Sequence, residues 1–396
     1  MKNKLQFLIV LWVVLLSGAV VFSHYYNMMF AVFVVLLFTY LFKFKLKKNI
    51  LKKFYAPLLF FLILIILNVI YNQNFSDNVT YLHLFTRIFL ASTIPLVLSF
   101  NEFRDKYLKI IYFLCWTSIT IFLIVVFFRE TVFLFPLITS NTGAFFHNLL
   151  LAVYNVPLQT FPKNSSIFWE PGAFQAFINI AIAFEVLFYK FQNKKRLIIF
   201  VIAILTTFST TGYIVFILQI ISFIFFTKTT NTGVNKIYKI LLFSLLGLFL
   251  FSGIFISSVI DKFSETNVSY FLRYVGTVLD LSIFTQSPIF GVGPSKYMIL
   301  IENSAYNEYG INMGVSSNSI TKLLAVYGFI FLFLMLYYYF KSTSLLGGKN
   351  FLKRLIYFCI LIIIFATENF ITSFFFLSIL FYGFQNKPVS DKINNY

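Results

Sequence analysis

The chain has 396 residues, of which 60% are hydrophobic and only 11% are charged. Charged residues make up about a quarter of an ordinary soluble domain, so this composition excludes a soluble globular protein. Apolar runs close to the roughly 20 residues that cross a bilayer recur from one end of the chain to the other. The sequence therefore predicts an all-α fold, a single integral membrane domain over residues 1–396.

The formal net charge of +18 does not indicate nucleic-acid binding here. Most basic residues lie in short connections between apolar runs, where they orient a membrane protein. Cys115 and Cys359 both lie inside apolar runs, so no disulfide framework is expected. The three histidines have no metal-ligand spacing, and neither a metal ion nor a cofactor is expected.

About twelve apolar runs are predicted to cross the membrane. The first follows a basic start, as in a signal peptide, but its apolar core is long and further spans follow it. We therefore interpret it as the first membrane helix. The expected spans are 5–23, 28–43, 55–71, 84–100, 107–128, 172–189, 197–209, 212–227, 238–257, 318–340, 355–367 and 369–384.

Basic residues are distributed unequally between the two alternating sets of connections. Most of the 31 lysines and arginines fall in the set that includes both termini, so the positive-inside rule places both termini in the cytoplasm. The other set contains two long external loops, 129–171 and 258–317, which carry the amphipathic stretches AFFHNLLLAVY and SYFLRYVGTVLDLSIF. Its basic residues are Arg87, Arg129, Lys163, Lys262, Arg273, Lys296 and Lys322.

The segment NSSIFWEPGAF, residues 164–174, is a polar interruption before the sixth span. Pro171 suits the first turn of a helix, which places Glu170 near the N-cap, where the helix dipole favours a carboxylate. One interpretation is an acidic helix start with Trp169 as an interfacial anchor. The other is that Glu170 faces an external cavity and binds a substrate hydroxyl or takes its proton.

A second polar segment, TTFSTTGYIV at 206–215, lies at the turn between two short spans and includes Tyr213. Its hydroxyl groups either satisfy backbone groups in a tight hairpin or line the floor of an external cavity.

The second external loop contains Arg273 and Tyr274, followed by the turn FGVGP. A guanidinium at an interface suits bidentate contact with phosphate. The alternative is a simple salt bridge, for example with Asp280 or Glu265.

The segment SSNS, residues 316–319, supplies a capped polar start to the tenth span and includes Asn318. Lys322 then lies about one turn into the membrane, and Arg87 is placed similarly in the fourth span. Both side chains either snorkel to the outer interface or join Arg273 in an anion site.

These four segments, in this order, resemble the O-antigen polymerase and O-antigen ligase family of bacterial membrane glycosyltransferases. The motifs that carry the resemblance are FWEPG, STTG, FGVGP and SSNS followed by VYGF, within residues 164–330. Ligase relatives often have a histidine where Ser317 stands, and many members have an acidic residue where Val326 and Tyr327 stand. Both departures favour a polymerase over a ligase.

The resemblance implies a metal-independent reaction on the outer face of the bacterial cytoplasmic membrane, in a GT-C-like glycosyltransferase architecture. A glycan on undecaprenyl diphosphate is the donor, and a lipid-linked repeat unit is the acceptor. The product is O-antigen, capsular polysaccharide or exopolysaccharide, and the suggested protein partners are a chain-length regulator and a flippase. Glu170 and Arg273 are the expected catalytic residues. Substrate binding is expected of Arg87, Lys322, Trp169, Tyr213, Tyr274 and Asn318.

Rival functions stay open at this point. An O-antigen ligase would transfer glycan to the lipid A core, and a cell-wall glycosyltransferase of the shape and division type shares the general architecture. A lipid-linked oligosaccharide flippase or other transporter should carry charges along a central path, whereas here the polar content gathers at the predicted outer face.

Overall fold

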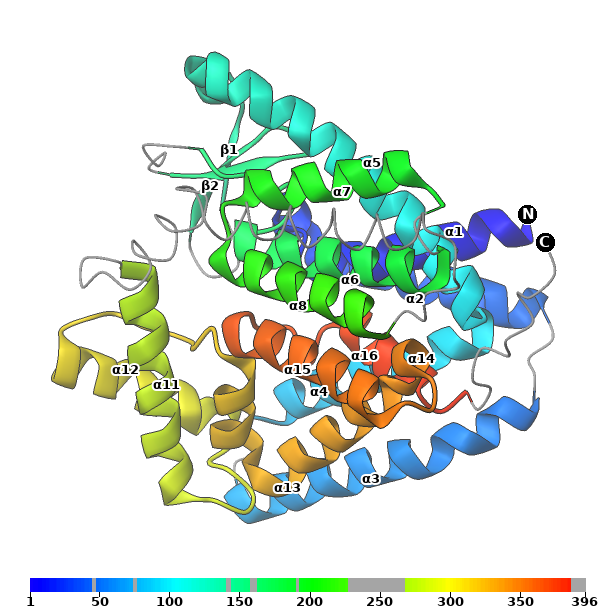
Figure 1. Cartoon of the computed structure of the whole chain (residues 1–396). Coiled ribbons are helices and arrows are strands. Elements are labelled where there is room, and N and C mark those ends of the chain that lie inside the picture. The colour runs from blue at the N-terminus through cyan, green and yellow to red at the C-terminus, as the bar shows by residue number, and fades with distance from the viewer. Residues whose placement is uncertain are drawn as a thin grey trace. The chain divides into compact units, whose positions relative to one another are not determined.

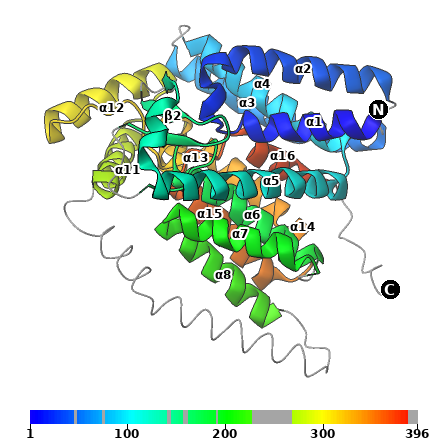
Figure 2. The ribbon, with the colours of Figure 1, turned by 90° about the horizontal axis from the view of Figure 1, so that it is seen from above.

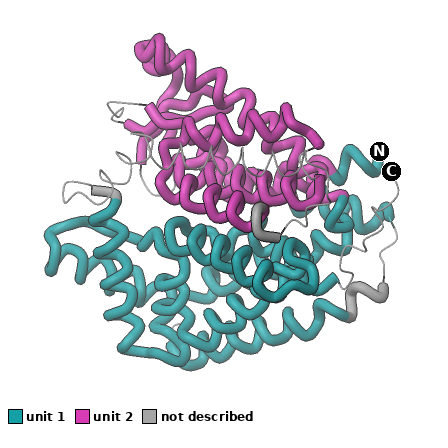
Figure 3. The backbone as a smooth tube through the Cα atoms, viewed as in Figure 1, with its two compact units in different colours: residues 1–6, 34–101, 265–396 teal, residues 7–33, 102–264 magenta. Residues whose placement is uncertain are grey.

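The computed structural model describes residues 1–44, 48–73, 77–139, 144–156, 162–189, 192–226 and 268–385. The described residues are mainly helical (Figure 1). The chain divides into two compact units, which are coloured separately in Figure 3. Unit 1 comprises Met1–Gln6, Val34–Asn101 and Glu265–Tyr396, and unit 2 comprises Phe7–Phe33 and Glu102–Ser264.

Helices form most of both units. The helices of unit 1 are α3 (Lys48–Asn72), α4 (Asn78–Val97), α11 (Val268–Gln286), α12 (Pro294–Tyr309), α13 (Ser319–Ser342), α14 (Ser344–Gly347), α15 (Phe351–Thr367) and α16 (Phe374–Tyr382). Those of unit 2 are η1 (Val20–Tyr25), η3 (Arg129–Leu134), α6 (Pro171–Tyr189), α7 (Lys194–Thr207), α8 (Thr210–Phe226) and most of α1 (Lys2–Leu15) and α5 (Phe100–Phe127). Helix α2 (Tyr26–Lys43) runs from unit 2 into unit 1.

Among the described residues, six helices are long and apolar enough to cross a membrane. Their lengths of 18 to 29 residues match the thickness of a bilayer core. The chain is thus compatible with a helical, membrane-embedded protein. The six segments are Tyr26–Lys43, Lys53–Asn72, Asn78–Val97, Phe100–Phe127, Pro171–Tyr189 and Ser319–Gly347.

Each predicted span except 238–257, which lies outside the described residues, coincides with a helix. Some of these helices are short: α1 and α7 have 14 residues each, and α16 has 9. The prediction of twelve crossings therefore stays a prediction.

The first span was expected to reach residue 23, but α1 ends at Leu15. The reason lies at Gly18, whose φ of +143° leaves the helical region and lets the Trp169 ring approach its backbone.

The first long loop contains a three-stranded antiparallel sheet, an exception to the all-α prediction. Its strands are β1 (Leu137–Thr139), β2 (Phe145–Asn148) and β3 (Val153–Asn155), in the order β1-β2-β3. The stretch AFFHNLLLAVY, expected to be amphipathic at the interface, supplies β2 and β3. Phe146 and Val153 are buried together with Val20, so the sheet is anchored through its apolar side chains.

The second long loop contains the helix that its amphipathic stretch predicts. Helix α11 packs against α12 and α13, and α13 also packs against α15 and α3. Figure 2 shows α11 and α12 together at one end of unit 1. Their shared apolar core includes Val275, Leu279, Tyr297 and Ala325.

Helix α13 is broken at Gly328, where φ is 79° and ψ is 177°. The turn before α12 fills this break. Val292 N donates to Ala325 O at 2.9 Å, and Gly293 N donates to Val326 O at 3.0 Å. The break frees backbone carbonyls inside an apolar helix, and the FGVGP turn supplies the donors that such carbonyls need.

The same turn and the start of α12 are also bonded to α3 and to the residue that precedes α4. Asn68 Nδ2 donates to Phe290 O, and Asp77 accepts a hydrogen bond of 3.1 Å from Ser295 N at the start of α12. Both Asn68 and Asp77 are buried. The turn is therefore bonded both to the break in α13 and to the α3–α4 pair of helices.

Candidate functional site

The four polar motifs form two directly bonded pairs, one in each unit. In unit 2, Asn164 N donates to Thr206 O and Asn164 Nδ2 donates to Thr206 Oγ1, both at 3.0 Å. These bonds join NSSIFWEPGAF to the TTFSTTGY hairpin. In unit 1, FGVGP is bonded to the α13 segment that contains VYGF, through the break described above. Motifs more than 30 residues apart in the chain thus meet inside each unit.

Glu170 directly precedes α6, as predicted from Pro171. Its carbonyl accepts from Ala173 N at 3.1 Å and from Phe174 N at 3.2 Å, so the helix begins at this residue. Trp169 Nε1 donates to Glu170 Oε1 at 3.1 Å, and both side chains are half-buried. The carboxylate is therefore oriented by the indole and still partly open to solvent.

A shallow pocket of unit 2 lies beside this helix start. The pocket is small and borders the start of α6 through Pro171. Its lining residues are Val153, Tyr154, Asn155, Pro162, Lys163, Ser165 and Pro171.

The hairpin at 206–215 matches the structural interpretation of its hydroxyl groups. Thr206 Oγ1 donates to Ala203 O at 2.8 Å, Thr207 Oγ1 donates to Ile204 O at 2.7 Å, and Gly212 N donates to Ser209 Oγ at 3.3 Å. Such bonds satisfy backbone groups near a helix end.

Tyr213, expected to bind substrate, is fully buried in this hairpin. Its hydroxyl donates to Leu205 O at 2.9 Å. A buried ring bonded in this way packs the hairpin and presents no exposed face to a sugar. Its predicted role would require the side chain to leave this position.

A polar stripe runs along α11 and consists of Arg273, Thr277 and Asp280. Their i, i+4, i+7 spacing places them on one face of the helix. Asn318 Nδ2 donates to Thr277 Oγ1 at 3.3 Å. Asn318 is also the N-cap of α13, as predicted, and its Oδ1 accepts from two backbone amides of the first turn. The middle of the stripe is therefore bonded to the start of α13.

Arg273 forms a salt bridge at one end of the stripe, but with a partner that the sequence did not suggest. Its Nη2 lies 3.3 Å from Oε1 of Glu368, which follows α15. The Glu368 side chain is 1% exposed and the Arg273 side chain 20% exposed. Asp280, one of the expected partners, is bonded elsewhere, and Glu265 lies outside the described residues.

Asp280, at the other end of the stripe, is fully buried. Its Oδ1 accepts from the Tyr297 hydroxyl at 2.8 Å, and its Oδ2 accepts from Thr321 Oγ1 at 2.7 Å. Burial raises the pKa of Asp280 to about 6, while the hydroxyl donors and the nearby Lys322 ammonium act in the opposite direction. The carboxylate therefore joins α11, α12 and α13 and is largely ionised at neutral pH.

Lys322 and Arg87 are brought together in unit 1. Lys322, on the first turn of α13, interacts electrostatically with both Asp280 and Arg87, which lies on α4. Both cationic side chains are half-buried. Arg273 lies two turns from Asp280 on α11, a separation of about 10 Å along the helix axis. We call these three residues of unit 1, Arg87, Lys322 and Arg273, the cation cluster, and the first two of them interact electrostatically with each other.

Tyr274, next to Arg273 in the chain, is 55% exposed and keeps an open aromatic face. The predicted site residues therefore fall into two groups. Arg87, Arg273, Tyr274, Asn318 and Lys322 belong to unit 1, whereas Trp169, Glu170 and Tyr213 belong to unit 2.

Sequence reasoning named Asp280 only as a possible salt-bridge partner of Arg273, and it did not single out Glu368. The signal for Asp280 is the helical spacing of Arg273, Thr277 and Asp280 on one face. Glu368 carries no comparable local signal, because its contact with Arg273 spans 95 positions of the chain.

Within the described residues, no group of three or more His, Cys, Asp or Glu side chains could hold a metal ion. The expectation of a metal-independent protein stays a prediction. Comparison with known proteins adds no identification: no family model matches the chain, and no curated protein matches it. The resemblance to the O-antigen polymerase and ligase family thus rests on the motifs quoted above.

Proposed function

We propose that the protein is a membrane glycosyltransferase that polymerises undecaprenyl-diphosphate-linked oligosaccharide repeat units on the outer face of the bacterial cytoplasmic membrane. The product would be O-antigen, capsular polysaccharide or exopolysaccharide. The observation that supports this proposal most is the cation cluster of unit 1, in which Lys322 and Arg87 interact electrostatically and both lie on apolar helices. Cations in such surroundings are costly, which makes a functional role the default hypothesis.

The cation cluster suits a reaction that leaves a diphosphate behind. The acceptor hydroxyl oxygen bonds to the anomeric carbon of the donor sugar while the bond from that carbon to the diphosphate oxygen breaks. The bonding electrons go to the diphosphate, and the hydroxyl proton goes to a base. Arg87, Lys322 and Arg273 would stabilise the negative charge that develops on the leaving group.

The other site residues have roles that follow from their exposure. Tyr274 follows Arg273 in the chain and has an exposed ring, which suits stacking against a sugar. Glu170 is held by Trp169 and is half-exposed, which suits binding the acceptor hydroxyl or accepting its proton.

A gel of the surface polysaccharide from a deletion strain tests the proposal. Loss of a polymerase leaves single repeat units attached to their final acceptor and removes the long chains. Loss of a ligase instead leaves long glycan on its lipid carrier, and loss of a flippase accumulates lipid-linked repeats on the inner leaflet. Either of these two patterns would contradict the proposed function.

Complementation of that strain tests the residues. Wild-type protein should restore the long chains, and both Arg273→Ala and Glu170→Gln should fail to do so although they insert into the membrane. Lys296→Ala is the matched control, because it removes an exposed cation from α12 that lies outside the cluster. Normal chain lengths in both site variants would show that these residues are wrongly assigned.

A further inference from the structure

Two of the three cations in the cluster have a buried acidic neighbour. Lys322 interacts with Asp280, and Arg273 is bonded to Glu368. The two carboxylates are 0% and 1% exposed. A site that only needed to attract a diphosphate would gain nothing from buried negative charges, since they reduce its positive potential.

The groups around Asp280 favour its ionised form, and they compensate its negative charge only in part. From α12 it faces the Tyr297 hydroxyl, and from α13 it faces the Thr321 hydroxyl and the Lys322 ammonium. Arg87 on α4 interacts with the same ammonium, and Arg273 lies further along α11. Donors on both carboxylate oxygens stabilise the ionised form, so the negative charge persists beside Lys322 at neutral pH.

We propose that Asp280 and Glu368 are internal counter-ions that weaken the hold of the cation cluster on a diphosphate, so that the lipid diphosphate product is released after each transfer. This inference rests on the proposed function and deepens it. The donor carries its sugar on the terminal phosphate, whereas the product has that phosphate free and therefore gains negative charge. The product would bind cations more tightly than the donor, and unopposed cations would trap it.

A counter-ion role and a purely structural role for Asp280 predict opposite changes in diphosphate affinity when the residue is replaced. If Asp280 only fastens α11 to α12 and α13, its replacement loosens the site and weakens diphosphate binding. If it is a counter-ion, removal of its charge raises the positive potential at Lys322 and strengthens binding as long as the Lys322 ammonium stays protonated, which a bound diphosphate favours. Asparagine suits this comparison, because it keeps the size of the side chain and one acceptor oxygen while it removes the charge, and its amide group can donate to a neighbouring hydroxyl oxygen.

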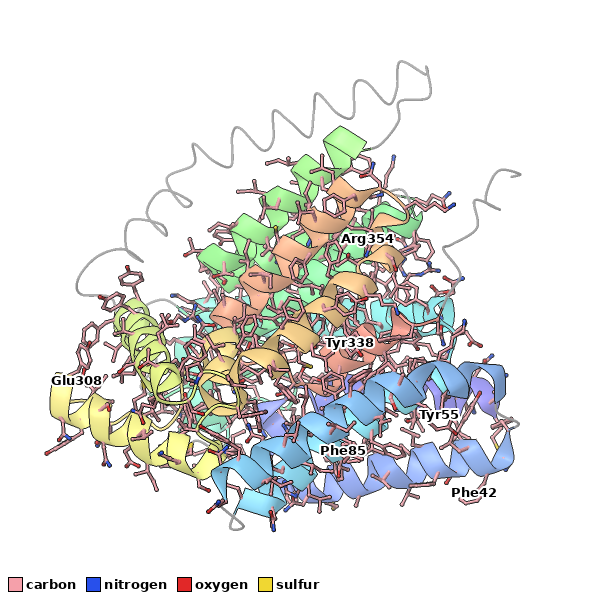
Figure 4. The ribbon with its side chains drawn as sticks, turned by 90° about the horizontal axis from the view of Figure 1, so that it is seen from below. Phe42, Tyr55, Phe85, Glu308, Tyr338 and Arg354 are labelled. Atoms are coloured by element: carbon pink, nitrogen blue, oxygen red, sulfur yellow. The ribbon has the colours of Figure 1, made fainter. Side chains whose placement is uncertain are left out.

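The test measures binding of farnesyl diphosphate to the purified full-length protein in detergent by titration calorimetry at pH 7.5. Asp280→Asn should bind this probe about tenfold more tightly than the wild type, the effect of one nearby buried charge. Glu368→Gln should shift affinity in the same direction. Glu308→Gln is the matched control, since it removes an exposed acid at the end of α12 (Figure 4) and should leave affinity within about twofold.

A second readout uses pH. Because the pKa of Asp280 is about 6, the wild type should approach the affinity of Asp280→Asn as the pH falls from 7.5 to 5.5. Comparison at each pH cancels the protonation of the probe itself. A constant affinity ratio between the two proteins would contradict the counter-ion role of Asp280.

Equal or weaker binding by Asp280→Asn and Glu368→Gln, in proteins that melt like the wild type, would overturn the inference. If Asp280→Asn does not fold, the affinity of Glu368→Gln decides by itself: equal or weaker binding than the wild type would overturn the inference. The proposed function fails separately, if the wild type extends no glycan while the charge-neutralised variants still bind the probe more tightly. Polymerisation by the wild type together with unchanged binding by the variants would overturn only the inference.

Discussion

At Asp280, a buried negative charge acts against the stability of the folded protein. It is fully buried, and burial raises its pKa to about 6 from an ordinary value near 4. A carboxyl whose pKa is raised on folding contributes stability that is present below its unfolded pKa. That contribution is lost as the pH rises through the folded pKa. The buried acid thus destabilises the protein at neutral pH, which favours a functional reason for its presence.

We predict a pH-dependent difference in stability between the wild type and Asp280→Asn. The wild type should lose up to about 3 kcal/mol relative to the variant as the pH rises from 4 to 7. Thermal unfolding of both proteins in detergent across this range measures the difference. A melting-temperature difference that does not change with pH would show that Asp280 does not carry the raised pKa.

Other residues show which features of single positions can be predicted from the sequence and which cannot. Pro171 and Asn318 could be placed at helix starts because the preferences of these positions are local. Tyr213 was expected to face a substrate and is instead buried, since no local pattern says which side of a hairpin is covered. The Arg273–Glu368 pair joins positions 95 apart, and such contacts follow only from the folded chain.

At the scale of elements, the helix positions were largely predictable, whereas the small sheet and the break in α13 were not. Long apolar runs determine where helices lie, because a bilayer leaves the backbone few other ways to satisfy its polar groups. The sheet of the first loop was missed because its strands have only three or four residues. The break at Gly328 was missed because its partner turn lies more than 30 residues earlier in the chain.

The contact between the FGVGP turn and the α13 break gives a prediction about glycine. Gly291 has φ +69°, and a Cβ there would lie 2.4 Å from backbone atoms of Val326. Gly291→Ala should therefore destabilise unit 1 by at least about 3 kcal/mol or prevent folding. Gly314→Ala is the control, because a Cβ at Gly314 meets nothing within 4 Å. Thermal unfolding and expression level measure both variants, and a well-folded Gly291→Ala would argue against this pairing.

At the scale of the whole molecule, the described residues support a membrane-embedded helical protein made of two compact units. Each unit contains one bonded pair of the four polar motifs. In unit 1, the buried carboxylates of Glu368 and Asp280 interact with Arg273 and Lys322, respectively. Our proposal is that these pairs allow the protein to bind a lipid diphosphate and then to release it.

The most direct test of the central claim is polymerisation by the purified protein. Wild-type protein in lipid nanodiscs, given undecaprenyl-diphosphate-linked repeat units, should produce a ladder of longer lipid-linked glycans, both with and without a metal chelator. Lys322→Ala should lower the rate by about 100-fold, the typical loss when one group that stabilises a developing charge is removed. Absence of any ladder with the wild type, or an undiminished ladder with Lys322→Ala, would contradict the account.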